Sequence, residues 1–358
     1  MGGAAMKQLF DPVRLGELDL STRFVMSPMT RSRAGAGDTP TELHALYYAQ
    51  RASAGLVVTE GVQPSPAGKG YCRTPGIYSQ AQVSGWREVA DAVHARGGRI
   101  VLQLMHCGRV ASPINKEDGS EIVAPSAIRA NARIFTDVDG LVDMEMPRAL
   151  DTDEVPMVVR EYREAAVNAR KAGLDGVELH CSSGYLPMQF LSSGTNQRTD
   201  RYGGSVENRI RFVMEVLDAM GAAIGFGRIG LRVCPGLTYN DIHDADPAGT
   251  YGALFENASK LGLAYLHLVR RTIGGMDNLE LARNHWRGRL VLNNDLTPEL
   301  AAEAISAGIA DAVSFGRPYI ANPDLVERIR QGIPLADFDA SRLYTAGPRG
   351  FTDYPAAT

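Results

Sequence analysis

Cysteine is scarce in this chain of 358 residues, with four thiols at positions 72, 107, 181 and 234. So few thiols in so long a chain do not form the disulfide framework that is typical of small secreted proteins. The opening residues, MGGAAMKQLF, also lack the apolar core of a signal peptide. We therefore expect reduced thiols and a cytoplasmic location.

Long apolar runs and a surplus of one charge sign are missing as well. No apolar stretch approaches the roughly 20 residues that a membrane-spanning helix needs. The net charge is -4, from 37 basic and 41 acidic residues, so the chain lacks the basic surplus typical of nucleic-acid binding. We therefore expect neither a membrane nor a nucleic acid as partner, and a small molecule instead.

Short apolar runs and amphipathic segments alternate regularly along the chain. The apolar runs predict eight strands, at residues 24–29, 56–62, 100–104, 176–179, 228–233, 264–268, 290–293 and 311–315. A helix is predicted after each strand, at 41–52, 80–96, 151–172, 205–222, 247–261, 277–286, 297–307 and 322–331. Continuous apolar strands are expected when both faces of a parallel sheet are buried. The pattern predicts an α/β protein with a single (β/α)8 TIM barrel domain spanning residues 1–358.

Two additions to the plain barrel are expected. Residues 9–23 alternate apolar and polar around Gly16, which predicts an N-terminal hairpin. The long insertion after the third strand, residues 108–150, is typical of a lid or a binding element. An open doubly wound sheet is disfavoured because the GxGxxG match at 225–230 precedes a strand, whereas a dinucleotide loop follows one.

The chemistry of such barrels sits where strands end. The predicted strand ends supply Pro28, Met29, Thr30, Gly61, Gln103, His180, Arg232, Asn293, Asn294, Gly316 and Arg317. An amide such as Gln103 can both donate to and accept from a pyrimidine edge. The last two strands commonly build a phosphate site, for which Arg317 offers a fork of donors. Singly, Gln103 suits a structural hydrogen bond and Arg232 a salt bridge, but together these groups predict bound flavin mononucleotide (FMN).

His180 and Tyr185 follow the fourth strand closely. A His and a Tyr at one strand end are suited to orienting a carbonyl and delivering a proton. Taken alone, each is also compatible with a satisfied polar group on a loop. A metal site built from His106-Cys107 and His180-Cys181 is disfavoured, because adjacent strand residues point to opposite sides. We therefore predict catalytic roles for His180 and Tyr185 and no metal.

Several longer motifs carry a family resemblance over nearly the whole chain. They are LFDPVRLGELDLSTRFVMSPMTRSR, GWREVADAVHARGGRIVLQLMHCGR, GYLPMQFLSSGTNQRTDRYGGSVENRIRF, ADAVSFGRPYIANPDLVERI and GFTDYP. In these motifs the chain resembles the Old Yellow Enzyme family of FMN-dependent ene-reductases. The resemblance implies a (β/α)8 barrel that reduces the C=C bond of α,β-unsaturated carbonyl compounds with electrons from NAD(P)H.

The resemblance also implies roles for individual residues. The FMN contacts would come from Thr30, Gly61, Gln103, Arg232 and Arg317. His180 would hold the substrate carbonyl and Tyr185 would supply the proton. Tyr71, Met105 and Phe351 would line the substrate space. The resemblance leaves open whether the reductant is NADH or NADPH and whether the protein is a monomer or a homodimer.

Four departures from the family pattern concern the pocket. Ser183 stands three residues after His180, where the family usually has Asn or His, so the second grip on the carbonyl is shorter. Met105 replaces a frequent Trp, Phe351 a frequent Tyr, and the stretch LNNDLT a Gly-containing turn. These changes leave flavin binding expected and put the usual substrate range in doubt.

Three other functions are alternatives to this prediction. The first is a dedicated biosynthetic flavoenzyme of the same fold that acts on a specialised enone, even in the dehydrogenating direction. The second is a flavin-free aldolase or isomerase acting on a sugar phosphate, disfavoured because no Lys or carboxylate base is evident at a strand end. The third is a non-catalytic flavin-binding module, disfavoured because both His180 and Tyr185 are present.

Overall fold

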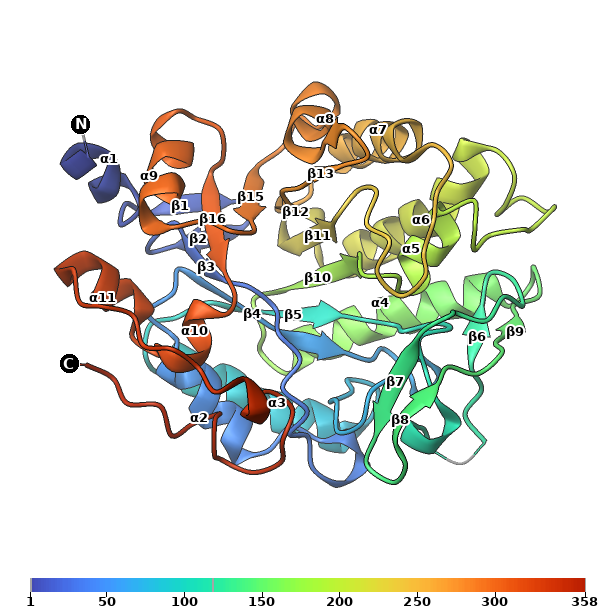
Figure 1. The fold of residues 1–358 in the computed structure, drawn as a ribbon, viewed down its shortest axis with the longest axis horizontal. Helices are drawn as coiled ribbons and strands as arrows, with labels where there is room; N and C mark the ends of the chain where they lie inside the picture. The colour runs from blue at the N-terminus through green and yellow to red at the C-terminus, as the bar shows by residue number, and fades with distance from the viewer. Residues whose placement is uncertain (1, 118, 358) are drawn as a thin grey trace.

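The computed structural model describes residues 2–117 and 119–357. Eight parallel strands close into a barrel in the spatial order β10-β11-β12-β15-β16-β3-β4-β5 (Figure 1). They are β3 (Phe24–Met26), β4 (Leu56–Val62), β5 (Ile100–Leu104), β10 (Gly176–Cys181), β11 (Ile229–Val233), β12 (Tyr265–Val269), β15 (Leu290–Asn293) and β16 (Ala312–Phe315). This closed barrel confirms the predicted fold class.

Amphipathic helices surround the barrel and bury their apolar faces against it. They are α2 (Glu42–Gln50), α3 (Gln80–His94), α4 (Val155–Lys171), α6 (Val206–Ile224), α7 (Pro247–Ala258), α8 (Asn278–His285), α9 (Pro298–Ser306) and α11 (Leu325–Gln331). Local signals set where they begin. Ser79 caps α3 in a capping box with Gln82, and Asp246 caps α7 ahead of Pro247.

The N-terminal hairpin closes the bottom of the barrel. Its strands, β1 (Val13–Leu15) and β2 (Leu18–Leu20), pair antiparallel, and their leucines pack with residues of six barrel strands, including Val25 and Val101. Gly16 turns the hairpin with φ +58°, and a Cβ there would lie 2.4 Å from the carbonyl oxygen of Gly227. This end of the barrel is therefore filled, which leaves the opposite end for a ligand.

The insertion after β5 contains short strands of its own. The strands β7 (Arg133–Thr136) and β8 (Gly140–Asp143) form an antiparallel hairpin, and β6 (Val123–Ala124) pairs with β9 (Arg148–Ala149). Figure 1 shows the β7–β8 hairpin standing apart from the ring of helices. Across the described residues, no helix combines the length and the apolar character needed to cross a membrane.

The remaining elements are short ones that periodicity does not predict. Among the described residues they are α1 (Gly2–Gln8), α5 (Leu186–Leu191), α10 (Pro318–Ala321), the strand pair β13 (Thr272–Ile273) and β14 (Met276–Asp277), and six 3-10 helices.

The first barrel strand ends at Met26 rather than at the predicted residue 29. Pro28 explains the early end, because proline has no N–H to donate to a ladder. As anticipated, the glycines at 225–230 end α6 and lead into β11, so they form no dinucleotide loop.

Candidate active site

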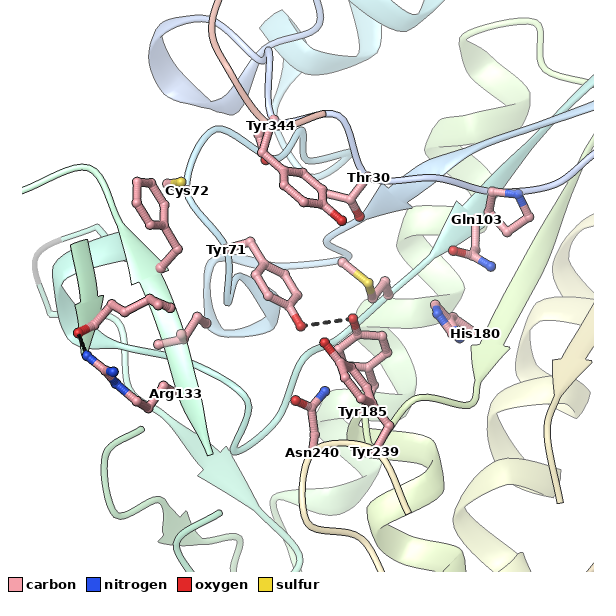
Figure 2. A pocket seen from close by; sticks show the side chains of 16 residues that line it. Thr30, Tyr71, Cys72, Gln103, Arg133, His180, Tyr185, Tyr239, Asn240 and Tyr344 are labelled. Carbon is pink, nitrogen blue, oxygen red and sulfur yellow. Dashed lines mark hydrogen bonds between the residues drawn. The ribbon is translucent and has the colours of Figure 1, made fainter. Parts of the chain in front are cut away.

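A cavity of about 440 Å³ opens at the carboxyl ends of β3, β5 and β10, the end of the barrel opposite the hairpin. Figure 2 shows its walls, with side chains from the barrel strands on one side and from the β7–β8 hairpin on the other. Its lining comprises Pro28, Thr30, Ser32, Tyr71, Cys72, Gln103, Met105, Arg133, Ile134, Phe135, Leu141, His180, Tyr185, Tyr239, Asn240 and Tyr344. The strand-end argument thus locates the cavity correctly.

His180 and Tyr185 meet at one side of this cavity. The ring of Tyr185 lies edge-on to the imidazole, with centroids 4.8 Å apart. Nδ1 of His180 is buried and has no hydrogen-bond partner among the described residues. Burial, followed by the positive charge of Arg232, lowers the pKa of His180 to about 3. The imidazole is therefore neutral at neutral pH, and one of its nitrogens carries a hydrogen that it can donate.

Tyr185 is paired with a second phenol. Its hydroxyl lies 3.1 Å from the hydroxyl of Tyr71, as the dashed line in Figure 2 marks. Burial, and then the neighbouring Tyr71, raises the pKa of Tyr185 well above its ordinary value. Tyr185 therefore keeps its proton at neutral pH, as a general acid must. Its position is set by the backbone, since its carbonyl accepts the N–H of Gln189 in the first turn of α5.

A buried polar network lies beside the cavity, inside the barrel. Strand register places Gln103 next to Glu178, and Arg232 next to His267. The Gln103 amide donates to Glu178 at 2.8 Å, and the same carboxylate accepts from His267 at 2.8 Å. Arg232 contacts the His267 ring at 2.7 Å and donates to Asn293 at 2.9 Å. The predicted residues Gln103, Arg232 and Asn293 are thus joined into one network.

A second hollow, of about 360 Å³, lies at the ends of β12 and β15. Arg270, Arg271 and Asn294 contribute to its lining. Asn294 takes the left-handed φ of +91° and donates its amide to the carbonyl of Arg270. The LNNDLT turn therefore keeps a conformation that glycine usually supplies. The two arginines, which outnumber the one carboxylate in the lining, Asp295, suit an anionic group.

The predicted site residues fall into two groups. Seven of them line the main cavity, namely Pro28, Thr30, Tyr71, Gln103, Met105, His180 and Tyr185. The others lie outside its lining, namely Met29, Gly61, Ser183, Arg232, Asn293, Asn294, Gly316, Arg317 and Phe351. Of these, Arg232 and Asn293 belong to the buried network, Asn294 lines the second hollow, and Arg317 lies exposed at the start of α10.

The structure corrects the expected position of Phe351. Its ring is fully buried and stacks on Tyr47 at a centroid distance of 4.0 Å, with the guanidinium groups of Arg31 and Arg33 against it. Phe351 is therefore part of the core. From the C-terminal segment, Tyr344 reaches the cavity instead.

Ser183 also differs from what its spacing predicts. It has the left-handed φ of +58°, its carbonyl accepts the amide of Asn240 at 2.8 Å, and its side chain is absent from the cavity lining. Asn240, from the loop after β11, lines the cavity instead. Gly61 makes room for a wall residue, because a Cβ there would lie 2.4 Å from the sulfur of Met105.

Several other residues that line the cavity were not predicted from the sequence. Tyr239, Asn240 and Tyr344 come from loops with no periodic signal. The hairpin residues Ile134 and Leu141 were indicated only by the length of the insertion and by its short alternating runs at 132–135 and 141–146. The one usable signal for the network was Glu178, a charge in the middle of the apolar run GVELHC.

Comparison with known proteins identifies the family. Residues 8–336 match the NADH:flavin oxidoreductase / NADH oxidase family. The chain belongs to this family. It is 41% identical to a probable flavin mononucleotide-dependent alkene reductase of Leishmania infantum, over 97% of each chain. It is 39% identical to 12-oxophytodienoate reductase 7 of Oryza sativa subsp. japonica, over 97% of this chain and 94% of the relative.

Solved structures agree with this assignment. Morphinone reductase superposes with a TM-score of 0.93 at 44% identity, covering 97% of this chain and 96% of the other. The old yellow enzyme homologue from Zymomonas mobilis also gives 0.93, at 40% identity over 97% of this chain and 99% of the other. The resemblance to the Old Yellow Enzyme family is thereby confirmed, and with it FMN as the cofactor and NAD(P)H as the reductant.

The residues present fit a flavin of this kind. His180 lines the cavity, and among the described residues its buried Nδ1 has no hydrogen-bond partner, so the imidazole is free to bind a ligand. Gln103 presents a neutral amide and Arg232 a cation, the combination that suits an amide-rich ring that gains electrons. The second hollow supplies arginines for a phosphate.

Proposed function

We propose a separate role for each of these cavity and network residues in the FMN-dependent reduction of α,β-unsaturated carbonyl compounds by NAD(P)H. When bound, FMN supplies the chemistry that takes hydride from the nicotinamide and passes it to the β-carbon of the alkene. The protein must therefore hold the ring, polarise the substrate carbonyl and provide one proton. One observation carries this proposal: His180, whose Nδ1 has no hydrogen-bond partner among the described residues, lies against Tyr185 with the two ring centroids 4.8 Å apart.

His180 holds the substrate. A neutral imidazole donates one hydrogen bond to the carbonyl oxygen of the enone, and that bond strengthens as negative charge develops on the oxygen. The low pKa of His180, about 3, keeps the ring in this neutral form throughout the physiological range. Since the side chain of Ser183 does not line the cavity, we infer that any contribution from Ser183 passes through water. Asn240, which lines the cavity, offers a side-chain amide that could donate the second hydrogen bond to the substrate carbonyl.

Tyr185 delivers the proton to the α-carbon. Its raised pKa keeps it protonated, and the residue as a whole is 7% exposed, so bulk water has little access to replace it. The Tyr71 hydroxyl, 3.1 Å away, holds the phenol in place. Met105 is a buried apolar wall of the cavity, and the exposed side chains of Tyr239 and Tyr344 lie at its lining.

Two groups of residues hold the cofactor. Thr30, Gln103 and Arg232 face the ring, with Pro28, Met29 and Gly61 supporting them from the adjoining strand ends. Asn294 with Gly316, Arg317 and the two arginines of the second hollow binds the phosphate. The supporting observation is the placement of Asn294, Arg270 and Arg271 around one hollow at the ends of the sixth and seventh barrel strands.

The four cysteines are all buried and free, which supports a reducing compartment such as the cytoplasm.

Anaerobic half-reactions test the proposal. NADH or NADPH is mixed with the FMN-loaded protein, and loss of the yellow absorbance reports reduction. Cyclohexenone, maleimide or a larger polycyclic enone is then added, and return of the absorbance reports transfer to the alkene. We expect reduction by at least one nicotinamide and reoxidation by at least one enone with formation of the saturated ketone. Protein that binds FMN but is not reoxidised by any enone refutes the proposed reaction.

A further inference from the structure

A buried carboxylate beside the cavity has no role in the scheme above. Glu178 lies on β10 two residues before His180, so both side chains point to the same face of the strand, into the barrel. The side chain of Glu178 is fully buried. A buried carboxylate is costly unless it is paired and hydrogen-bonded, so its partners must account for its presence.

Three donors converge on this carboxylate. Oε1 accepts the Gln103 amide at 2.8 Å, and Oε2 accepts Nδ1 of His267 at 2.8 Å and the hydroxyl of Tyr265 at 3.1 Å. Burial raises the pKa of Glu178, but the His267 ring and the other donors outweigh it, and the pKa ends below its ordinary value. Glu178 is therefore an anion that can only accept hydrogen bonds.

An acceptor-only partner decides which way Gln103 points. Because ionised Glu178 cannot donate, the amide nitrogen of Gln103 must face it. The oxygen of Gln103 and its second N–H are then left for the cavity, which Gln103 lines. Glu178 thus selects the atoms that Gln103 presents to a ligand.

The same carboxylate supports Arg232 through His267. One nitrogen of Arg232 lies 2.7 and 3.1 Å from the two nitrogens of the His267 ring, so the guanidinium covers the imidazole. Nδ1 of the same ring lies 2.8 Å from Glu178, and Nε2 lies 2.7 Å from the hydroxyl of Ser314. A cation in this position favours the neutral ring, and burial with Arg232 lowers the pKa of His267 to about 4. Glu178 is therefore the counter-charge of Arg232, with His267 between them.

From this geometry we propose that Glu178 is a positioning residue for the flavin ring, acting on it through Gln103 and through the His267–Arg232 pair. The inference rests on the placement of the ring against Gln103 and Arg232 in the proposed function. It goes further because it assigns the orientation of one ring contact and the charge balance of the other to a residue that does not touch the ring.

The test compares three variants of the FMN-loaded protein. Glu178→Gln removes the charge and lets the Gln103 amide take either orientation. Glu178→Asp keeps the charge but withdraws it from Gln103. Tyr265→Phe is the matched control, because it removes a buried hydrogen bond to Oε2 of the same carboxylate and leaves the hydrogen bonds of Gln103 and Arg232 in place. The dissociation constant of FMN and the midpoint potential of the bound flavin are measured for each, with circular dichroism to verify the fold.

We expect Glu178→Gln to raise the FMN dissociation constant about tenfold to a hundredfold, the range for a hydrogen bond to a charged group. Its midpoint potential should become more positive, because Arg232 loses its counter-charge and stabilises the electron-rich ring more strongly. Tyr265→Phe should leave both quantities near the wild-type values. Equal values for Glu178→Gln and Tyr265→Phe would overturn the proposal.

If Glu178→Gln does not fold, Glu178→Asp decides the question. Weaker FMN binding with a nearly unchanged potential supports the positioning of Gln103, and unchanged binding refutes it. These measurements need no alkene. A wild-type protein that binds FMN but reduces no enone would therefore refute the proposed function and leave the role of Glu178 separately measurable.

Discussion

Tyr185→Phe separates the two half-reactions most sharply. Phenylalanine retains the ring that lies edge-on to His180 at 4.8 Å, so the local packing is preserved and only the hydroxyl is lost. The nicotinamide step needs no proton from this residue, whereas the alkene step does. We therefore expect reduction by NAD(P)H to keep its rate while reoxidation by an enone slows.

The size of the effect follows from the surroundings of the hydroxyl. General acid catalysis is worth about 10²–10⁴-fold in rate. Tyr185 is 7% exposed and its hydroxyl faces that of Tyr71, so water has little access to take over. We therefore expect a loss near the middle of that range, about 10³-fold, which corresponds to roughly 4 kcal/mol of activation free energy.

Stopped-flow absorbance of the flavin measures both steps in the same preparation. Tyr71→Phe is the companion variant: it removes the partner hydroxyl but keeps the donor, and we expect a reoxidation rate about tenfold lower at most, from one lost hydrogen bond. A Tyr185→Phe protein that loses both half-reactions equally would refute the assignment of Tyr185 as proton donor.

Three further outcomes follow from the structure. Because the pKa of His180 is about 3, the reoxidation rate should show no imidazole titration between about pH 5 and 8, and His180→Ala should raise the KM for enones; a step near the ordinary histidine pKa would contradict this. Phe351→Ala should cost about 3–5 kcal/mol of unfolding free energy without changing enone KM, as urea denaturation and steady-state assays will show. Unfolding free energy should fall as pH drops from about 6.5 toward 4, because the unfolded chain binds more protons there; denaturant titrations across this window check the contribution of His44, His106, His180 and His267.

Local pattern determined a large part of this molecule. Strands 56–62, 100–104 and 290–293 have the predicted bounds to the residue, because a short continuous apolar run flanked by helical segments has few other solutions in a parallel barrel. The same pattern places His180 and Gln103 at one end of the barrel, since parallel strands all end on the same side.

Tertiary structure alone decided which C-terminal side chain reaches the cavity. Arg31 and Arg33 bind the segment that carries Tyr344 and Phe351 through its backbone carbonyls, at Leu343 and Gly350 among others. A carbonyl is the same for every residue type, so these bonds leave no trace in the sequence. They bury Phe351 and leave Tyr344 at the cavity.

For Glu178, too, the sequence shows one part of the role and the tertiary structure decides the other. A charge inside the run GVELHC is visible in the sequence and signals a partner. The identity of that partner depends on the register between β10 and β5 and on the pairing that places β12, with His267, two strands from β10 in the closed barrel. Sequence therefore determined the strands and the end of the barrel where they meet, whereas register and closure decided which side chains touch, because those contacts join residues 75 and 89 positions apart.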